Sequence, residues 1–399
     1  MNSIHIVTAY APDEDQEAIR SEAERFCRNE LGPLAGPMDN EESWPEHVFP
    51  LLGAQGYLGL TVPEEYGGQG LGLVAAGMVS EVMHKWNPAI GLSWAAHDNL
   101  CVNNIYRNAD EEQRRRFLPG LCDGSQVGAL GLTEPGAGSD ALGSMATTAV
   151  RDGDEYVLNG AKTYITNGPI ADVILTYAKT DPAAGPHGIS AFVVETATPG
   201  FEVAAKLIKQ GFRGSQTGEL VYQECRVPAA NLIGGENEGV AVVMNGLDIE
   251  RAFLAPGSVG MAQRCYELSL GYAESRRQFD RPIAEFQAIQ HKLADMWVGI
   301  ETARTYCYRV LEMCAEVEAG EPIPPDLHAH SAAAILYAAE MNTRVADDAV
   351  QIHGGAGYMW EMEINRLYRA GKLLEIGAGT SEIRRNIIAG HLRSTVPPV

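Results

Sequence analysis

The sequence predicts an α+β protein of three consecutive domains: an all-α N-terminal domain, a middle antiparallel β domain and a C-terminal helical bundle. Helix-like periodicity alternates with Gly and Pro up to about residue 128, and long helical patterns return from about residue 237. Between them, short β-rich runs are separated by turn signals such as Asn159-Gly160 and Pro199-Gly200. We therefore expect domains at 1–128, 129–236 and 237–399.

The N-terminal segment carries two clear helix starts. Asp13 and Asp110 each precede a helical pattern whose first turn is acidic, which suits the positive end of a helix dipole. We expect both aspartates to be N-caps.

The middle segment contains the runs EYVLNG, DVILTYAKT, ISAFVVE, FEVAAKLI and ELVYQECRV. Their spacing predicts an antiparallel barrel or sandwich. The sequence YITNG at 164–168 predicts a strand that ends in a hairpin turn.

The C-terminal segment has Ala-rich stripes with polar opposite faces, as in long packed helices. The run PIPPD at 322–326 cannot continue a helix, so we expect it to link two of them. Pro256 lies inside another helical pattern, where we expect it to remove a backbone donor and bend the helix.

Composition narrows the function classes. Thirty basic against 52 acidic residues give a net charge of −22, which argues against nucleic acid and anionic membranes as partners. There is no stretch of 18 apolar residues and no secretory-type N-terminus. The seven cysteines form no CxxC pair and no Cys/His cluster, so we expect no metal, reduced thiols and a cytoplasmic protein.

Three glycine-containing motifs are candidates for ligand binding: LTEPGAGSD at 132–140, HGGAGY at 353–358 and GAGTSEIRR at 377–385. Taken singly, each fits an ordinary turn or a helix cap equally well. In the third, Thr380 or Ser381 is expected to cap a helix whose free amides could hold a phosphate or a flavin edge.

Glu250 is the most informative single residue. In VVMNGLDIERAFLAP its neighbours one helical turn away are apolar or small, including Gly246 and Phe253. A carboxylate on an apolar stripe has either a partner or a raised pKa and a proton-transfer role. Asp248 and Arg251 lie on another face and could pair with each other. Glu250 itself fits a structural salt bridge as well as a catalytic role.

Seven blocks in order across essentially the whole chain resemble the acyl-CoA dehydrogenase family, with the isovaleryl-CoA dehydrogenase branch as the nearest match. The blocks are LTEPGAGSD, YITNGP, KQGFRGSQTGEL, GLDIERAFLAPGSVGMAQ, SRRQFDRPIAEFQAIQHKLADM, QIHGGAGY and GKLLEIGAGTSEIRR. The resemblance implies the acyl-CoA dehydrogenase fold, FAD as cofactor and a homotetramer in which FAD lies where domains and a neighbouring subunit meet.

The family's binding positions carry over residue by residue. Positions that match contacts to FAD, including those made from the neighbouring subunit, are Leu130, Leu132, Thr133, Gly138, Ser139, Tyr164, Ile165, Thr166, Arg276, Gln287, Gln351, Gly354, Gly355, Thr380, Ser381 and Glu382. Positions that match the thioester and pantetheine channel are Ser139, Asp248, Arg251, Gly377, Ala378 and Gly379.

The catalytic base distinguishes branches of this family. Most members place a Glu just before the Gly-Thr of the C-terminal motif, where this chain has Ala378. The isovaleryl-CoA branch instead places its Glu in a D-x-E-R setting, and here that residue is Glu250. The resemblance therefore implies Glu250 as the base that removes the α-proton of an acyl thioester while a hydride passes from Cβ to FAD. It further implies the Ala378 amide as a donor to the thioester carbonyl, and the small Gly377 and Ala378 favour a short or branched, isovaleryl-like acyl group.

One departure affects the expected electron acceptor. Relatives often have Trp where this chain has Tyr164, near the surface that meets electron-transfer flavoprotein, which we still expect as a partner. Two alternatives stay open: an acyl group on a carrier protein in secondary metabolism instead of CoA, and a flavoprotein oxidase or a non-catalytic flavin-binding scaffold.

Overall fold

The computed structural model describes residues 12–395, and within that range it leaves the side chains of Asn245, Leu247 and Asp248 undescribed. The chain divides into two compact units, each assembled from separated segments. The helical unit comprises Met1–Gly36, Leu73–Pro88 and Arg251–Val399, and the sheet unit comprises Pro37–Gly72 and Ala89–Glu250. Each unit is described by itself below.

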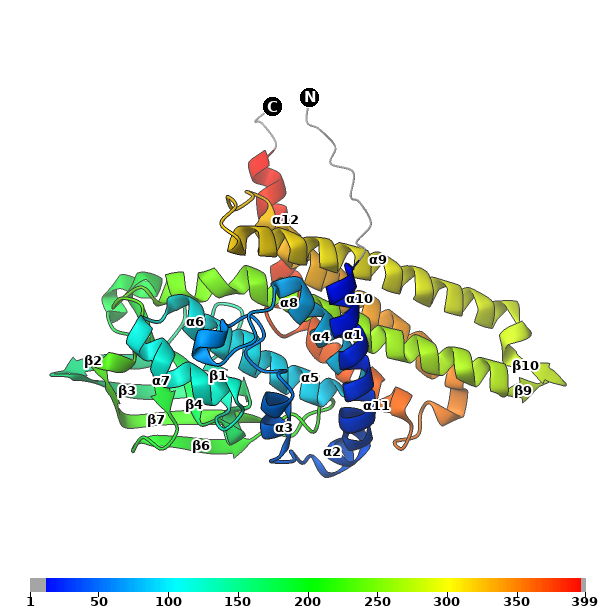
Figure 1. Ribbon diagram of the computed structural model, residues 1–399, viewed down its shortest axis with the longest axis horizontal. Coiled ribbons are helices and arrows are strands. Elements are labelled where there is room, and N and C mark those ends of the chain that lie inside the picture. The colour runs from blue at the N-terminus through cyan, green and yellow to red at the C-terminus, as the bar shows by residue number, and fades with distance from the viewer. Residues whose placement is uncertain (1–11, 396–399) are drawn as a thin grey trace. The chain divides into compact units, whose positions relative to one another are not determined.

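The helical unit is built around long helices. In it α10 lies against α9, α11 and α12, and α4 lies against α1 and α9 (Figure 1). The bounds of its helices are α1 Glu14–Phe26, α4 Leu73–Trp86, α9 Gln287–Glu318, α10 Leu327–His353, α11 Glu363–Gly371 and α12 Ser381–Thr395.

Helix α8 spans Gly239–Ser275 and so begins in the sheet unit and ends in the helical unit. It continues through Pro256 without a break in the helix. A short hairpin of β9 (Arg277–Gln278) and β10 (Arg281–Pro282) leads from α8 to α9. The link between α9 and α10 contains PIPPD, as predicted, because proline cannot continue either helix.

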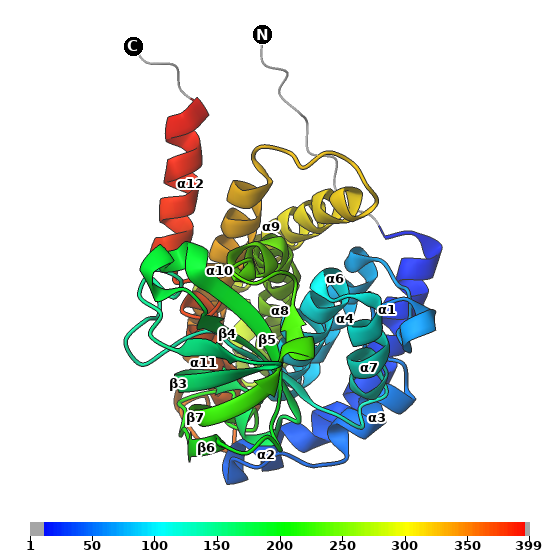
Figure 2. The same ribbon diagram turned by 90° about the vertical axis from the view of Figure 1, so that its left-hand side faces the viewer.

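The sheet unit holds several short helices and an eight-stranded sheet (Figure 2). Its helices are α3 Val48–Ala54, α5 Pro88–Ala95, α6 Asn104–Asn108 and α7 Glu111–Cys122, with a π-helix at Ala96–Asn103, while α2 (Ala35–Glu41) joins the two units. Its strands are β1 Gly128–Gly131, β2 Thr148–Asp152, β3 Glu155–Thr166, β4 Val173–Lys179, β5 Ile189–Glu195, β6 Phe201–Lys206, β7 Thr217–Pro228 and β8 Leu232–Ile233.

The strand order is β6-β7-β3-β2-β4-β5-β8, with β1 also paired to β4. Most pairs are antiparallel, as expected, but β1 and β2 both run parallel to β4. The sheet is therefore mixed and does not close into a barrel. The hairpin predicted after Thr166 is wrong, because β3 pairs with β2 and β7 whereas β4 pairs with β1, β2 and β5.

Strands β4 and β5 are buried on both faces, which explains their largely apolar sequences. On β4, Val173, Leu175 and Tyr177 enter one core cluster together with residues of α6 and α7. Ile174 and Ala178 point to the opposite face and enter a second cluster. This alternation follows the two-residue repeat of a strand.

Capping confirms the predicted helix starts. Asp13 and Asp110 both form capping boxes, with Gln16 and Gln113 as the reciprocal partners. Gln113 also donates to the carbonyls of Ala230 and Leu232, so it ties α7 to the end of the sheet.

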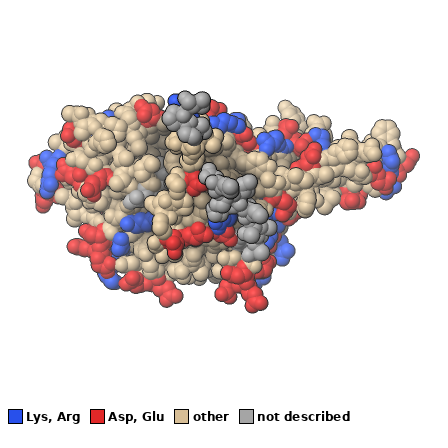
Figure 3. Space-filling model, turned by 90° about the horizontal axis from the view of Figure 1, so that it is seen from above, with Lys and Arg blue, Asp and Glu red and all other residues tan. Residues whose placement is uncertain are grey.

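None of the helices in the described part of the chain combines the length and apolar content that crossing a bilayer requires. On the face in Figure 3, the described basic side chains are scattered among acidic ones. The seven cysteines are all buried and unpaired as disulfides.

Candidate active site

The glycine-rich loop at 132–140 lies beside the end of β3, so the structure brings together two of the motifs that the sequence singles out. The Thr163 amide donates to the carbonyl oxygen of Thr133 at 2.9 Å. The Lys162 ammonium donates to the carbonyl oxygen of Leu132 at 3.2 Å. The predicted flavin-contacting positions from Leu130 to Ser139 and from Tyr164 to Thr166 therefore form one group within the sheet unit.

A buried ion pair anchors this loop. Lys162 Nζ lies 2.8 Å from Glu134 Oε1, and the two side chains are 0% and 4% exposed. Glu134 also accepts hydrogen bonds from the amides of Ala146 and Thr147. Burial lowers the pKa of Lys162 to about 8, against the opposing effect of Glu134. The pair holds the loop in place through these contacts. The sequence analysis did not single out either residue.

A β-bulge aims Tyr164 away from the sheet. The register of β3 against β7 shifts between Lys162 and Ile165, and Tyr164 adopts a φ of 59°. Bulges often redirect a side chain beside a functional site, and a positive φ is unusual for an aromatic residue. The Tyr164 side chain is consequently 71% exposed.

Glu250 follows the part of α8 that packs into the sheet unit. Val242 and Val243 belong to the same core cluster as Tyr177. One helical turn before Glu250, Gly246 lies so close to Asn104 that an added Cβ would meet its side-chain oxygen at 2.5 Å. Glu250 is itself partly buried, and burial together with the charge of Glu250 raises the pKa of Tyr177. The carboxylate thus lies within electrostatic reach of a buried tyrosine hydroxyl.

The loop before α12 has unusual backbone conformations. Ala378 has a φ of 54° and Gly379 a φ of 88°. Thr380 caps α12 by accepting from the Ile383 amide at 3.3 Å, which confirms one of the two predicted caps. The Ser381 hydroxyl is buried and makes no hydrogen bond within the described part of the chain. Strained backbone and an unsatisfied hydroxyl together are typical of a ligand site.

A third group of predicted positions lies at the C-terminal end of α10. The rings of Tyr272 and His353 stack with centroids 4.4 Å apart, which places the end of α8, near Arg276, beside Gly354. Gly354 follows α10 with a positive φ of 58°, and its ψ of −136° is outside the left-handed helical region. The hairpin after Arg276 is followed by a 3-10 turn at Ile283–Glu285, and α9 then begins at Gln287.

This third group lies far from the α12 loop along α10. Arg385, just after Glu382, pairs with Glu340 of α10 at 2.7 Å. Gly354 follows fourteen residues later, or about 20 Å along the helix axis. The structure therefore does not bring Gln351–Gly355 together with Thr380–Glu382.

Two predicted channel residues lie on α8 next to Glu250. Arg251 is buried, while the side chain of Asp248 lies outside what the structure describes, so their predicted pairing stays a prediction.

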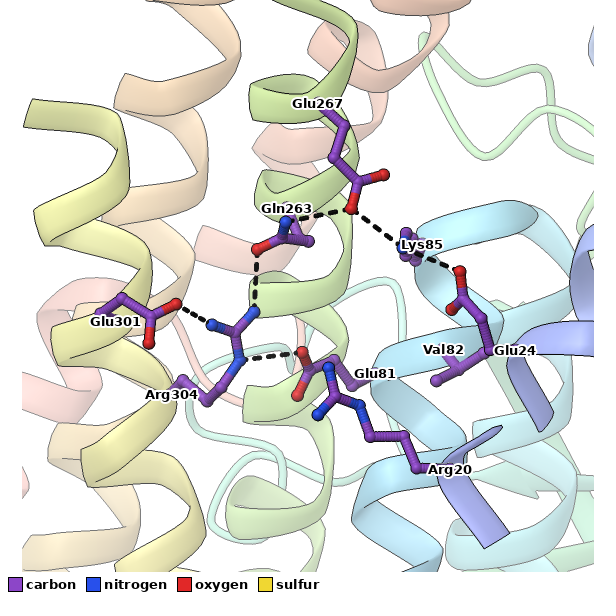
Figure 4. Close-up of a pocket in the computed structure, with 9 residues that line it drawn as sticks. All are labelled: Arg20, Glu24, Glu81, Val82, Lys85, Gln263, Glu267, Glu301 and Arg304. Atoms are coloured by element: carbon purple, nitrogen blue, oxygen red, sulfur yellow. Dashed lines mark hydrogen bonds and ion pairs between the residues drawn. The ribbon is translucent and has the colours of Figure 1, made fainter. Parts of the chain in front are cut away.

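A separate polar cavity of about 240 Å³ lies within the helical unit (Figure 4). Arg304 contacts Glu81, Glu301 and Gln263, and Lys85 contacts Glu24 and Glu267 at 2.9 and 3.0 Å. Because Arg304 and Lys85 both pair with carboxylates that line this cavity, we interpret these residues as a network that joins α1, α4, α8 and α9.

The comparisons with known proteins identify the class. Models of the acyl-CoA dehydrogenase N-terminal, middle and C-terminal domains match residues 13–125, 129–225 and 237–392. The chain belongs to the acyl-CoA dehydrogenase family and is an oxidoreductase.

Particular relatives give more detail. The chain is 44% identical to the mitochondrial isovaleryl-CoA dehydrogenase of Oryza sativa subsp. japonica over 95% of this chain and 91% of that protein. Among solved structures, it is similar to the prolyl acyl carrier protein oxidase AnaB, with a TM-score of 0.90, 33% identity and coverage of 96% and 100%. It is also similar to PigA in its FAD complex, with a TM-score of 0.90, 30% identity and coverage of 97% and 99%.

The family uses FAD, and the described residues fit that cofactor. A Cβ added to Gly138, Gly354 or Gly355 would meet nothing within 4 Å, so these backbone faces are open to a ligand. The unsatisfied hydroxyl of Ser381 lies at the start of α12, where amides favour anionic or polar groups. The exposed Tyr164 ring adds a flat surface beside the glycine-rich loop.

Sequence reasoning missed the residues that support the site. Glu134 lies inside the motif LTEPGAGSD, and its partner Lys162 lies 28 positions further on. Arg384 lies inside SEIRR, yet it is completely buried. The available signals were Lys162, which lies within a strand-like run, and Arg384, the first arginine of an adjacent pair. Neither signal is strong, because lysine and arginine side chains usually face solvent.

Proposed function

We propose that this protein removes a proton from Cα and a hydride from Cβ of a short or branched acyl thioester, leaving the trans-2-enoyl thioester. Glu250 is the proposed base. One observation carries the proposal: the loop position that holds Glu in most of the family holds Ala378, while Glu250 lies on α8 beside the core cluster of Tyr177. A helix packed into a core holds a base in place more rigidly than a loop does.

The proposed chemistry needs a polarised carbonyl, because the α-proton of a thioester is a very weak acid. The Ala378 amide donates to the thioester oxygen, where negative charge develops as the proton leaves. A fixed donor of this kind typically contributes about 3 kcal/mol to transition-state stabilisation. Glu250 accepts the proton, and its basicity increases when the acyl chain excludes water. FAD, when bound, supplies the acceptor for the hydride.

The substrate class rests on small residues and on similarity. Gly377 and Ala378 leave room near Cβ for a branch, and the relative from Oryza sativa is an isovaleryl-CoA dehydrogenase. We therefore propose an isovaleryl-like acyl group as the preferred substrate.

Anaerobic mixing of the FAD-loaded protein with isovaleryl-CoA, butyryl-CoA or octanoyl-CoA tests the proposal. Rapid loss of the visible flavin absorbance with isovaleryl-CoA is expected, with slower loss for octanoyl-CoA. If none of the three bleaches the flavin, CoA thioesters are not the substrates.

Glu250→Gln tests the base. The variant should keep its FAD and lose at least about 100-fold in the rate of flavin reduction, the usual scale for a general base. A rate near that of the unmodified protein would place the base elsewhere.

A carrier-bound substrate is the second candidate, favoured by the similarity to a prolyl acyl carrier protein oxidase. The same bleaching assay with isovaleryl-pantetheine on a carrier protein distinguishes the two. Flavin reduction by the carrier thioester, with none by the CoA thioester, would support this candidate. Peroxide formed in step with turnover in air would favour an oxidase.

Assembly and electron transfer complete the proposal. The separation of Gln351–Gly355 from Thr380–Glu382 along α10 supports an FAD site shared between subunits of a homotetramer. Burial against other subunits is supported by four exposed aromatic residues of the helical unit: Phe279, Trp297, Tyr358 and Trp360.

The exposed Tyr164 supports electron-transfer flavoprotein as the acceptor. The seven unpaired cysteines support a cytoplasmic location.

A further inference from the structure

Arg384 of α12 is one of the largest side chains in the protein that are completely buried. A buried guanidinium needs hydrogen-bond acceptors, because leaving its charge unsolvated is costly. Its Nη1 donates to the carbonyl oxygen of Leu374 at 2.9 Å, and its Nη2 donates to that of Gly377 at 2.6 Å. The arginine therefore binds the backbone of the segment that leads into α12.

The Gly377 carbonyl belongs to the same peptide group as the Ala378 amide. No peptide bond in the described part of the chain is cis, so this C=O and N–H point in opposite directions. With its oxygen held by Arg384, the peptide must direct the Ala378 N–H away from the guanidinium. Within residues 12–395 that N–H donates to no acceptor. It is free to donate to a ligand.

The loop needs this restraint because its backbone is not in a common conformation. Ala378 and Gly379 have consecutive positive φ values of 54° and 88°. Such conformations persist only where surrounding contacts determine them. The two hydrogen bonds from Arg384 are contacts of this kind, made from a helix to the start of the loop.

We infer that Arg384 is a positioning residue for the thioester oxygen: it sets the direction of the Ala378 N–H and strengthens it as a donor. The inference rests on the proposed function. A cationic donor on the carbonyl draws electron density from the peptide, which makes its N–H more positive. The effect is greatest when enolate charge develops on the thioester oxygen, so it favours the transition state over the ground state.

Arg384→Lys and Arg384→Met test this role, with Arg385→Met as the matched control. Lysine keeps the charge but cannot reproduce the two-pronged contact, and methionine removes both donors. Arg385 is the next residue on α12, but its side chain is exposed and pairs with Glu340. Each variant is prepared with FAD, and its flavin content and melting temperature are recorded first.

The deciding readout is the carbonyl stretching frequency of a bound enoyl-CoA labelled with carbon-13 at the thioester carbon. We use the enoyl product of the acyl-CoA that reduces the flavin. In the unmodified protein and in Arg385→Met the frequency should lie well below its value in water. In Arg384→Lys it should return part of the way towards that value, with flavin reduction slowed about tenfold or more.

The outcomes separate this inference from the proposed function. If no acyl thioester reduces the flavin of the unmodified protein, the proposed function itself fails. If the unmodified protein is active and Arg384→Lys keeps both the lowered frequency and the rate, Arg384 does not position the donor. Loss of FAD or of the folded state in both Arg384 variants would assign the residue a purely structural role and would also overturn the inference.

Discussion

Removing the charge of Glu134 should loosen the glycine-rich loop at 132–140, which we propose as part of the FAD site. Glu134→Gln leaves the Lys162 ammonium, which is 0% exposed, without its counter-ion. Glu134 also accepts two backbone amides, from Ala146 and Thr147, and a glutamine has only one oxygen with which to serve them. Removing one partner of a buried ion pair typically lowers the free energy of unfolding by about 3–5 kcal/mol.

The expected change in melting temperature follows from that free energy. For a folding unit of roughly 150–250 residues, each kcal/mol corresponds to about 2–4 °C. We therefore expect the melting temperature of Glu134→Gln to fall by about 10 °C, measured by circular dichroism with excess FAD. The flavin-to-protein absorbance ratio after gel filtration should fall as well, because the loop at 132–140 loses its anchor.

Two controls make this result specific. Asp152→Asn breaks an exposed pair with Arg226 in the same unit and should change the melting temperature little. Glu134→Gln combined with Lys162→Met removes both charges and should recover part of the loss, since an unpaired buried charge is no longer present. A melting temperature for Glu134→Gln within about 2 °C of the unmodified protein would refute the reasoning.

Two further predictions concern other buried ionisable groups. Burial raises the pKa of Asp98 to about 7, against opposing hydrogen bonds from the Gly59 and Leu60 amides. The folded state then keeps a proton that the unfolded state loses, so stability should fall by about 4 kcal/mol as the pH rises from about 4 to 7. In urea titrations across this range, Asp98→Asn should flatten that dependence, and an unchanged slope would contradict the assignment. In the network of Figure 4, Arg304→Met leaves the buried Glu81 without its cation and should cost about 3–5 kcal/mol in urea unfolding. The control Arg309→Met, on the same helix but in more exposed pairs, should cost much less, and equal losses would show that burial does not decide the effect.

Local signals in the sequence were sufficient where the structure depends on near neighbours. The caps at Asp13 and Asp110 and the proline-rich link between α9 and α10 involve residues only a few positions apart, so pattern alone located them. The order of helical and β-rich segments was predictable for the same reason. Seven ordered blocks then identified the family and its cofactor.

Pairing between distant segments could not be predicted in this way. The turn at Asn167 looked like a hairpin, but its side chain is buried and donates to the carbonyls of Ser93 and Gly128. These acceptors lie 74 and 39 positions away, so the chain is redirected by contacts that no local pattern contains. The buried contacts of Lys162 and Arg384 could not be predicted, because lysine and arginine side chains usually lie at the surface.

The position of the base can be tested by moving it. Glu250 on α8 and residue 378 on the α12 loop are the two positions at which the resemblance to the family implies a base, and of these two only Glu250 is a carboxylate in this chain. The loop should tolerate a glutamate at 378, because Ala378 already carries a Cβ at a φ of 54° and the backbone would not have to change. We expect Glu250→Gln with Ala378→Glu to reduce flavin faster than Glu250→Gln alone, although more slowly than the unmodified protein, because the longer side chain also narrows the acyl pocket. That narrowing should act most on branched chains, so the double variant should prefer butyryl-CoA over isovaleryl-CoA in the anaerobic bleaching assay. A double variant that binds the enoyl product normally but is no faster than Glu250→Gln would show that the loop has lost the geometry of a base site and keeps only its role as an amide donor.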